Sequence, residues 1–211
     1  MAERAAIAVR PNGRVVGVDI SPKMLVLARQ RATARGLGNL KLLEGRAESI
    51  PADDKAFDVA LACLSMMYVI DREASAREIA RVPRPGGQFV ASVWAGPRSA
   101  KLSSSSKQPA SSPALHQFPG VGPGALADPA LFLAQLEAAG VEARVETETL
   151  GFDFPNFASA WDALAGVTTA QLAEERRQEA KNALKAAMYP NGDGPRRFRN
   201  VTQFVVGRRQ R

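Results

Sequence analysis

The chain has 211 residues, of which 45% are hydrophobic and 23% charged, which suits one sizeable soluble domain. A single cysteine, Cys63, excludes an internal disulfide and indicates a reducing cytoplasm, and no apolar run reaches the length of a membrane span. The formal net charge is +7, with six arginines between residues 196 and 211. A nucleic-acid partner is one interpretation of this charge, but the simpler one is a solvated basic tail.

The first clear element is a strand over residues 15–19 that ends in a carboxylate and leads directly into a helix. Ser21 suits the N-cap of that helix, Pro22 its first turn and Gly36 its end. In α/β folds, a carboxylate at the C-terminal end of a strand lies where nucleotides bind, and it can accept hydrogen bonds from both ribose hydroxyls. Asp19 is therefore a candidate ligand. The alternative is a carboxylate that only caps the strand end or the helix.

Apolar runs alternate with helical patterns over the first 94 residues. We expect four strands that lie parallel in one sheet, at residues 15–19, 40–43, 57–63 and 88–94, with helices at 22–35 and 71–81. The run at 57–63 is almost continuously apolar. This pattern predicts a strand buried on both faces, with Cys63 as an inert part of the core.

The alternation stops in a segment rich in serine, proline and glycine, residues 96–127, which predicts an irregular linker. Order returns at residue 128. A helix at 128–140, a strand at 141–150, helices at 157–165 and 170–188 and a last strand at 200–207 are expected. The chain thus divides into residues 1–95, a linker at 96–127, and residues 128–211, which complete the same domain.

Four stretches of the first part carry a family resemblance. They are Val-Val-Gly-Val-Asp-Ile-Ser-Pro-Lys-Met-Leu (15–25), Glu-Gly-Arg-Ala-Glu-Ser-Ile-Pro (44–51), Phe-Asp-Val-Ala-Leu-Ala-Cys (57–63) and Arg-Glu-Ile-Ala-Arg-Val-Pro-Arg-Pro-Gly-Gly-Gln-Phe (77–89). In order and spacing they resemble class I S-adenosylmethionine-dependent methyltransferases of the small-molecule and quinone type. The resemblance implies an α/β Rossmann-like sheet, mostly parallel with helices on both faces. It also implies S-adenosylmethionine as cofactor and a small-molecule methyl acceptor.

Carried over by position, the resemblance implies where residues 1–95 would bind the nucleoside part of the cofactor. Asp19 would bind the ribose hydroxyls. Ile20 and Met24 would pack on the adenine, although Met24 could equally be plain core. Ala47 would offer its backbone N–H to an adenine ring nitrogen, with Glu48 beside it.

The resemblance also implies a methionine side, where Leu64 and Ser65 would lie near the transferred methyl group. Methyl transfer mainly requires that the two reactants are held in line, so the sequence identifies no catalytic residue, although Tyr68 could orient an acceptor. A helical insertion within residues 128–211 would cap the acceptor. Apolar side chains available for that lid, or for ordinary core packing, are Phe157, Trp161, Leu164, Leu172 and Leu184. The sequence shows no cysteine and histidine cluster with metal-ligand spacing.

Two departures from the family pattern affect the cofactor site. The family's first strand and glycine-rich loop would precede the residues that correspond to 5–9, so we expect an N-terminally truncated sheet with unpaired strand edges and impaired cofactor binding. Arg46 stands where members often have an aspartate that accepts from the adenine amino group, and arginine has no acceptor.

Two other classes of function remain open. An inactive, truncated methyltransferase-like fragment or interaction module would have no affinity for the cofactor. A nicotinamide-dependent Rossmann enzyme also places an acid after its second strand. The Pro-Lys-Met-Leu helix start (22–25) and the Arg-Pro-Gly-Gly turn (84–87) argue against the nicotinamide enzyme. A nucleic-acid-modifying role ranks low, because only 6% of the residues are aromatic.

Overall fold

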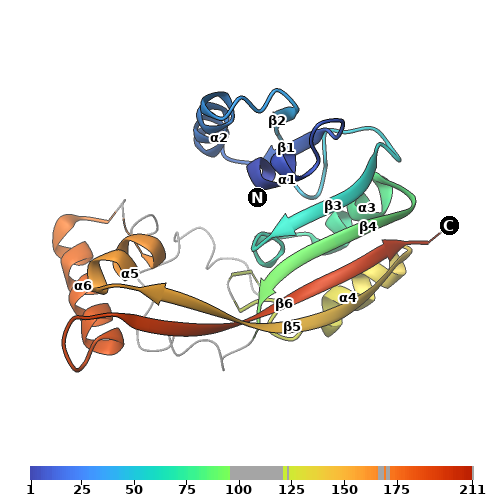
Figure 1. The fold of residues 1–211 in the computed structure, drawn as a ribbon. Helices are drawn as coiled ribbons and strands as arrows, with labels where there is room; N and C mark the ends of the chain where they lie inside the picture. Colours follow the sequence, from blue (N-terminus) through green and yellow to red (C-terminus); the bar gives the residue numbers. More distant parts are fainter. Residues whose placement is uncertain (96–120, 123, 166–168, 170–171, 211) are drawn as a thin grey trace.

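The computed structural model describes residues 1–95, 121–122, 124–165, 169 and 172–210. The helices are α1 (Ala2–Ala8), α2 (Pro22–Ala34), η1 (Met66–Tyr68), α3 (Arg72–Arg81), α4 (Ala130–Ala138), α5 (Phe157–Leu164) and α6 (Glu174–Met188). The strands are β1 (Val15–Asp19), β2 (Leu40–Glu44), β3 (Phe57–Cys63), β4 (Pro83–Trp94), β5 (Val141–Phe154) and β6 (Arg196–Arg209) (Figure 1). The expected elements are all found, and β4, β5 and β6 are longer than the sequence indicated.

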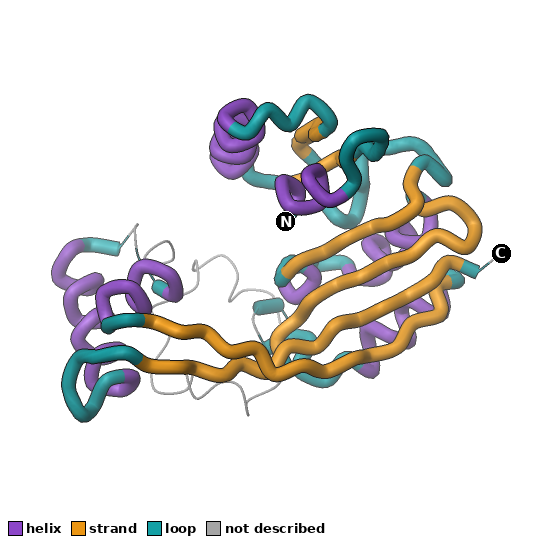
Figure 2. The backbone as a smooth tube through the Cα atoms, viewed as in Figure 1, coloured by secondary structure: helices purple, strands orange, loops and turns teal. Residues whose placement is uncertain are grey.

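The strands form two sheets, which Figure 2 shows as separate groups. β1 pairs with β2 in parallel, and the larger sheet has the order β3-β4-β6-β5. In the larger sheet β3 and β4 are parallel, whereas β6 runs antiparallel to both β4 and β5. The expectation that four parallel strands share one sheet is therefore wrong. The four expected strands form two separate parallel pairs, β1 with β2 and β3 with β4.

The division between the sheets runs between β1 and β3. Within the described residues, β1 is paired with β2 alone and β3 with β4 alone, so each strand has one edge without a ladder partner. The sequence led us to expect unpaired strand edges, and these edges belong to β1 and β3. Backbone N–H and C=O groups at such an edge must bond to water or to another chain segment. That a further strand lies between them in a longer form of the protein stays a prediction.

The larger sheet packs its main core on one face. α3 and α4 lie together on that face (Figure 1), where Ile79, Phe132 and Leu136 meet Phe89 and Val93 of the sheet. The rings of Phe89 and Phe132 meet edge to face, with centroids 6.3 Å apart. Core packing of this kind supplies most of the stability of an α/β layer.

The sequence suggested that β3 is buried on both faces, but the face away from α3 and α4 is exposed. Ala60 and Ala62 pack toward the core, but the alternating Val59 and Leu61 are 43% and 47% exposed. Cys63 on the same side is also exposed, so its expected place in the core is wrong. Because side chains alternate along a strand, packing by α3 and α4 buries only every second residue.

The pairing of β3 with β4 contains one large irregularity. Phe57 pairs with Pro83, and the next pair joins Val59 to Gln88, so residues 84–87 loop out of the ladder. This loop is the expected Pro-Gly-Gly turn, and Gly86 adopts the positive φ of 76° that glycine allows. A strand that starts before the turn explains why β4 is longer than predicted.

A second core lies at the far end of the β5–β6 ribbon (Figure 1). There α5 and α6 pack around Phe157, Trp161 and Tyr189, with Leu184 and Phe198 against them. Aromatic contacts dominate, and the rings of Phe157 and Tyr189 meet with centroids 5.6 Å apart. The α5–α6 layer therefore holds together through its own apolar contacts.

The arginine-rich C-terminal segment is part of this ribbon. The Arg197 guanidinium lies 3.5 Å from the Asp153 carboxylate, Arg196 stacks over the ring of Tyr189, and the Arg208 side chain donates to the carbonyl of Gly86. The segment is therefore a paired strand and not a free tail, although the side chains of Arg197 and Arg208 are exposed to solvent as expected. An ion pair, a ring contact and a hydrogen bond hold Arg197, Arg196 and Arg208 within the fold.

Most of the expected linker lies outside the residues that the structure describes. Residues 96–120 and 123 lie outside the described residues, and the described end of the segment contributes Leu126 to the main core. The assignment of residues 96–127 as a linker, with a cofactor part before it and a cap after it, stays a prediction.

Phe132→Ala should lower the free energy of unfolding by about 3–5 kcal/mol, because it removes a fully buried ring from the main core. Leu131, its neighbour in α4, is 60% exposed, so Leu131→Ala should change the stability by less than about 0.5 kcal/mol. Urea denaturation of the two variants beside the parent chain measures both values. Similar losses for the two substitutions would contradict the placement of the core face of α4.

Candidate functional site

Asp19 ends β1 and faces the first turn of α2. Its side chain is half-buried, and Oδ1 accepts a hydrogen bond of 2.8 Å from the backbone N–H of Ser21. Ser21 in turn caps α2, with Oγ accepting from the N–H of Met24 at 3.4 Å. Within the described part of the chain, no hydrogen bond reaches Oδ2 of Asp19. The carboxylate thus serves the local turn with one oxygen and keeps acceptor capacity for a ligand on the other.

Two large apolar side chains lie exposed next to this carboxylate. Ile20 is 59% and Met24 52% exposed, although both are side chains that normally become buried. The alternative that Met24 is part of the core is therefore wrong. Leu25, the next residue, takes the core position of this helix turn at 2% exposure. Exposed apolar surface beside an acceptor is suited to an aromatic ring that carries a ribose.

The loop after β2 lies directly beside Asp19. Asp19 and Glu44 are register partners in the parallel pair, and the N–H of Gly45 donates to the carbonyl of Asp19 at 3.2 Å. Gly45 leaves little free space, because a Cβ atom there would lie 2.7 Å from the Cδ of Pro51 and 3.0 Å from the Cγ1 of Val18. Close packing therefore fixes the start of this loop against the end of β1.

The loop continues through the predicted adenine-side residues. Arg46 and Ser49 form an isolated bridge, Ala47 packs against the main core, and the side chain of Glu48 is only 15% exposed. An ion pair of 3.4 Å joins the Arg46 guanidinium to the Glu48 carboxylate. The arginine that departs from the family pattern thus carries a carboxylate beside it, which restores an acceptor to this part of the loop.

The end of β3 supplies the predicted methionine-side residues. Leu64 has a φ of 51°, in the left-handed region that few residues other than glycine adopt, and its N–H donates to the carbonyl of Ser92 at 2.9 Å. Ser65 is exposed, and its carbonyl accepts from the N–H of Tyr68. Such backbone geometry costs about 1–3 kcal/mol and clusters at functional sites. Partial burial raises the pKa of the Tyr68 hydroxyl, so this group stays protonated at neutral pH.

The structure joins some predicted site residues and leaves others apart. Asp19, Ile20 and Met24 adjoin one another through the end of β1 and the start of α2, and the loop with Ala47 and Glu48 follows from the register partner of Asp19. Ala47 and Leu64 pack against the same core cluster. Leu64 and Ser65 belong to the other sheet, and within the described residues no hydrogen bond joins them to Asp19.

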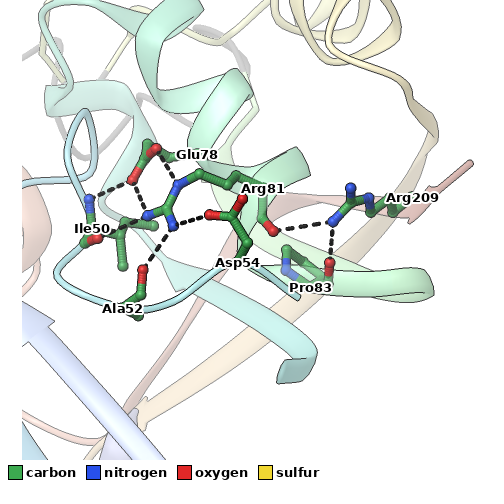
Figure 3. Close-up of polar contacts among 7 residues, drawn as sticks. All are labelled: Ile50, Ala52, Asp54, Glu78, Arg81, Pro83 and Arg209. Atoms are coloured by element: carbon green, nitrogen blue, oxygen red, sulfur yellow. Dashed lines mark hydrogen bonds and ion pairs between the residues drawn. The ribbon is translucent and has the colours of Figure 1, made fainter. Parts of the chain in front are cut away.

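Two residues that the sequence analysis did not select hold the loop in place. Arg81 and Glu78, both on α3, bond to the backbone of Ile50 and Ala52 (Figure 3). Both lie in the quoted stretch 77–89, but nothing in that pattern tells which loop they would contact. Among the described residues, no group of three or more histidine, cysteine or acidic side chains is arranged to hold a metal ion.

The proposed lid residues behave mainly as core. Phe157 and Trp161 are 4% and 3% exposed and pack with Leu184 in the second core, so ordinary packing explains them. Leu164 is 39% exposed on the same helix layer. No helix of the described residues is long and apolar enough to cross a membrane.

Comparison with known proteins finds similarity to methyltransferases in the first part of the chain. Residues 2–91 match the methyltransferase domain family. The demethylmenaquinone methyltransferase of Geobacillus kaustophilus is 41% identical over 85 residues, a match that covers 40% of this chain and 36% of that protein. The chain thus spans little more than a third of the length of that relative.

The fold comparison extends over the whole chain. The crystal structure of the YcgJ protein of Bacillus subtilis has a TM-score of 0.64 and covers 100% of this chain and 88% of that one, at 18% identity. Geranyl diphosphate methyltransferase in complex with S-adenosylmethionine has a TM-score of 0.52 at 15% identity, and covers 98% and 73%. At this level of identity the likeness shows the fold alone, and it confirms the expected α/β Rossmann-like fold.

Gly45→Ala should destabilise the protein by about 1–3 kcal/mol, because the added methyl group meets the rigid Pro51 ring. Gly38→Ala is the matched control, since nothing lies within 4 Å of a Cβ at that position. This control should be neutral or slightly stabilising. Denaturant unfolding compares the two, and an equally harmless Gly45→Ala would contradict the close packing of the loop against β1.

Proposed function

Because the chain is related to class I S-adenosylmethionine-dependent methyltransferases in sequence over residues 2–91 and in fold throughout, we propose that it transfers a methyl group from S-adenosylmethionine to a small-molecule acceptor. The observation that carries this proposal is the junction of β1, α2 and the loop after β2. It brings a carboxylate with a free oxygen next to exposed Ile20 and Met24.

The residues present fit the nucleoside part of this cofactor. A ribose needs an acceptor for its hydroxyls, which Oδ2 of Asp19 can supply. An adenine ring needs apolar surface, which Ile20 and Met24 present at 59% and 52% exposure. Its polar edge needs backbone or carboxylate partners, for which Ala47 and Glu48 are the candidates.

Bound S-adenosylmethionine would supply the electrophile, a methyl group on a positively charged sulfur, while the acceptor would supply the nucleophile, so a general base is optional. The task of the chain is to bind the nucleoside, exclude water and hold the acceptor in line. Leu64 and Ser65 are the residues that we propose lie near the transferred methyl group. Tyr68, protonated and 40% exposed just after them, can donate a hydrogen bond that orients a polar group of the acceptor.

The acceptor class is inferred from the name of a relative and from the α5–α6 layer. The relative from Geobacillus kaustophilus is named for methylation of demethylmenaquinone, a quinone. We extend this to a small apolar or aromatic acceptor for the present chain, covered by the part of the protein that includes α5 and α6. A reducing cytoplasm, inferred from the single cysteine, is the proposed location.

A second candidate function rests on the unpaired edges of β1 and β3. Without a ladder between them, the ends of β1 and β3 are less firmly held than in a continuous sheet. A chain of this kind could serve as an interaction module with no affinity for the cofactor. Calorimetric titration with S-adenosylmethionine distinguishes the two functions directly, since only the enzyme gives a binding isotherm.

Asp19→Ala should weaken binding of S-adenosylmethionine by about 1.5–3 kcal/mol, the cost of losing hydrogen bonds to a charged group. Asp19→Asn keeps an acceptor for Ser21 and loses the carboxylate, so it separates the ligand role from the cap role. Asp58→Ala, at an exposed ion pair with Arg84, is the control. Equal affinity of all three variants in calorimetry would remove Asp19 from the site.

An N-terminal extension should strengthen cofactor binding. We predict that the 211-residue form binds S-adenosylmethionine at least tenfold more weakly, about 1.4 kcal/mol, than a version with a family-typical strand and glycine-rich loop grafted onto residue 5. The added strand would pair with both free edges and hold Asp19 and Leu64 at a fixed separation. Titration of both forms measures the difference, and equal affinities would show that the unpaired edges do not weaken the site.

A further inference from the structure

The Arg81 side chain uses every one of its hydrogen-bond donors (Figure 3). Nε and Nη2 donate to the two oxygens of the Glu78 carboxylate, both at 2.7 Å. Nη1 donates to the carbonyl of Ala52 and to the carboxylate of Asp54, both at 2.7 Å, and Nη2 also donates to the carbonyl of Ile50 at 2.9 Å. A guanidinium has five N–H groups, so none is left unpaired.

Glu78 and Arg81 together hydrogen-bond both backbone groups of Ile50. Oε2 of Glu78 accepts a hydrogen bond of 2.6 Å from the N–H of Ile50, whose carbonyl is bonded by Arg81. The hydrogen bond from Arg81 holds the pKa of the Glu78 carboxyl below its ordinary value, so the pair is charged at neutral pH. Both backbone groups of Ile50 are therefore fixed from the same turn of α3.

Hydrogen bonds also join the C-terminal end of α3, where Arg81 lies, to the larger sheet. The carbonyl of Arg81 accepts from the N–H of Lys55 and from Nη1 of Arg209, each at 3.0 Å. Arg209 belongs to β6 and also donates to the carbonyl of Pro83, at the start of β4. The end of α3 is thus tied to two strands of the sheet, whereas its side chains reach out to the loop.

The bonded residues follow immediately after the candidate adenine-side residues. Ile50 comes two positions after Glu48, in a loop that Gly45 fixes to Asp19 at its other end. We propose that Arg81, with Glu78, is a positioning residue that holds residues 46–54, hereafter the clamped loop, in the place where Ala47 and Glu48 meet the nucleoside of the cofactor. This inference rests on the proposed function and adds a residue distant from the ligand to the site.

The geometry requires arginine at this position. Only a planar fork can bond two carboxylates and two carbonyls at once, whereas a lysine ammonium has three donors on a single atom. Arg81→Lys should therefore retain some of these hydrogen bonds and Arg81→Met none. Without these bonds the clamped loop would sample other conformations, and the cofactor would bind only the fraction that is correctly placed.

Three variants of the full chain test the proposal: Arg81→Met, Arg81→Lys and Arg209→Met. Arg209→Met removes bonds to the same end of α3 but touches no residue of the clamped loop, so it controls for a general loss of stability. S-adenosylhomocysteine serves as the probe in calorimetry, and hydrogen exchange followed by mass spectrometry reports the amides of residues 46–54 without any ligand. Both are measured at a temperature where unfolding curves show every variant fully folded.

Arg81→Met should raise the Kd for S-adenosylhomocysteine at least tenfold and accelerate hydrogen exchange in the clamped loop. Arg81→Lys should give intermediate values. Arg209→Met should stay close to the parent chain in both measurements. Parent-like affinity of Arg81→Met overturns the inference and leaves the proposed function intact. A comparable loss of affinity in Arg209→Met also overturns it, because the effect is then one of stability. Failure of the parent chain to bind the probe rejects the proposed function and this inference with it.

Discussion

The β1–β2 layer and the larger sheet share no backbone ladder within the described residues, so their connection depends on the chain between β2 and β3. That connection is fixed at both ends. Gly45 is packed between Val18 and Pro51, and Arg81 bonds the carbonyls of Ile50 and Ala52. In a continuous sheet the hydrogen bonds of neighbouring strands would set this separation. Here a short loop and one guanidinium group perform the same task, which makes the candidate site sensitive to a few side chains.

The main core and the second core are separate hydrophobic clusters of the described residues. The main core, under α3 and α4, holds the strands whose ends carry Leu64 and Ser65. The second core gathers Phe157, Trp161 and Tyr189 at the end of the β5–β6 ribbon, remote from the main core. Because it has its own aromatic contacts, the α5–α6 layer can change in sequence without disturbing the main core. Variation in acceptor among related folds is compatible with such an arrangement.

Local signals in the sequence were sufficient for the elements and insufficient for their assembly. Ser21 caps α2 as expected, Asp71 caps the helix expected at 71–81, and Gly36 adopts a positive φ of 59° just after α2 ends. These are short-range interactions that a sequence displays directly. We expected one sheet and the structure has two, because an apolar run indicates a strand but does not indicate which strands it pairs with. The exposure of Cys63 follows from the same missing information.

The site was likewise predicted in part. The carboxylate of Asp19 and the exposed side chains of Ile20 and Met24 lie together as expected, because they are neighbours in the sequence. The roles of Glu78 and Arg81 were missed, since their partners Ile50 and Ala52 are 28 and 29 positions away. The left-handed backbone of Leu64 was also unpredictable, because leucine is not a residue type that marks such a conformation.

The position of β6 between β4 and β5 has a consequence for the order in which the protein can form. β4 ends at Trp94, but its antiparallel partner begins only at Arg196, near the end of the chain. During synthesis on the ribosome, one edge of β4 therefore stays open until the residues of β6 have emerged. Loop closure over such a span slows folding and leaves apolar strand surface accessible in the meantime. The larger sheet is therefore completed only when β6 arrives, long after β4 has been made.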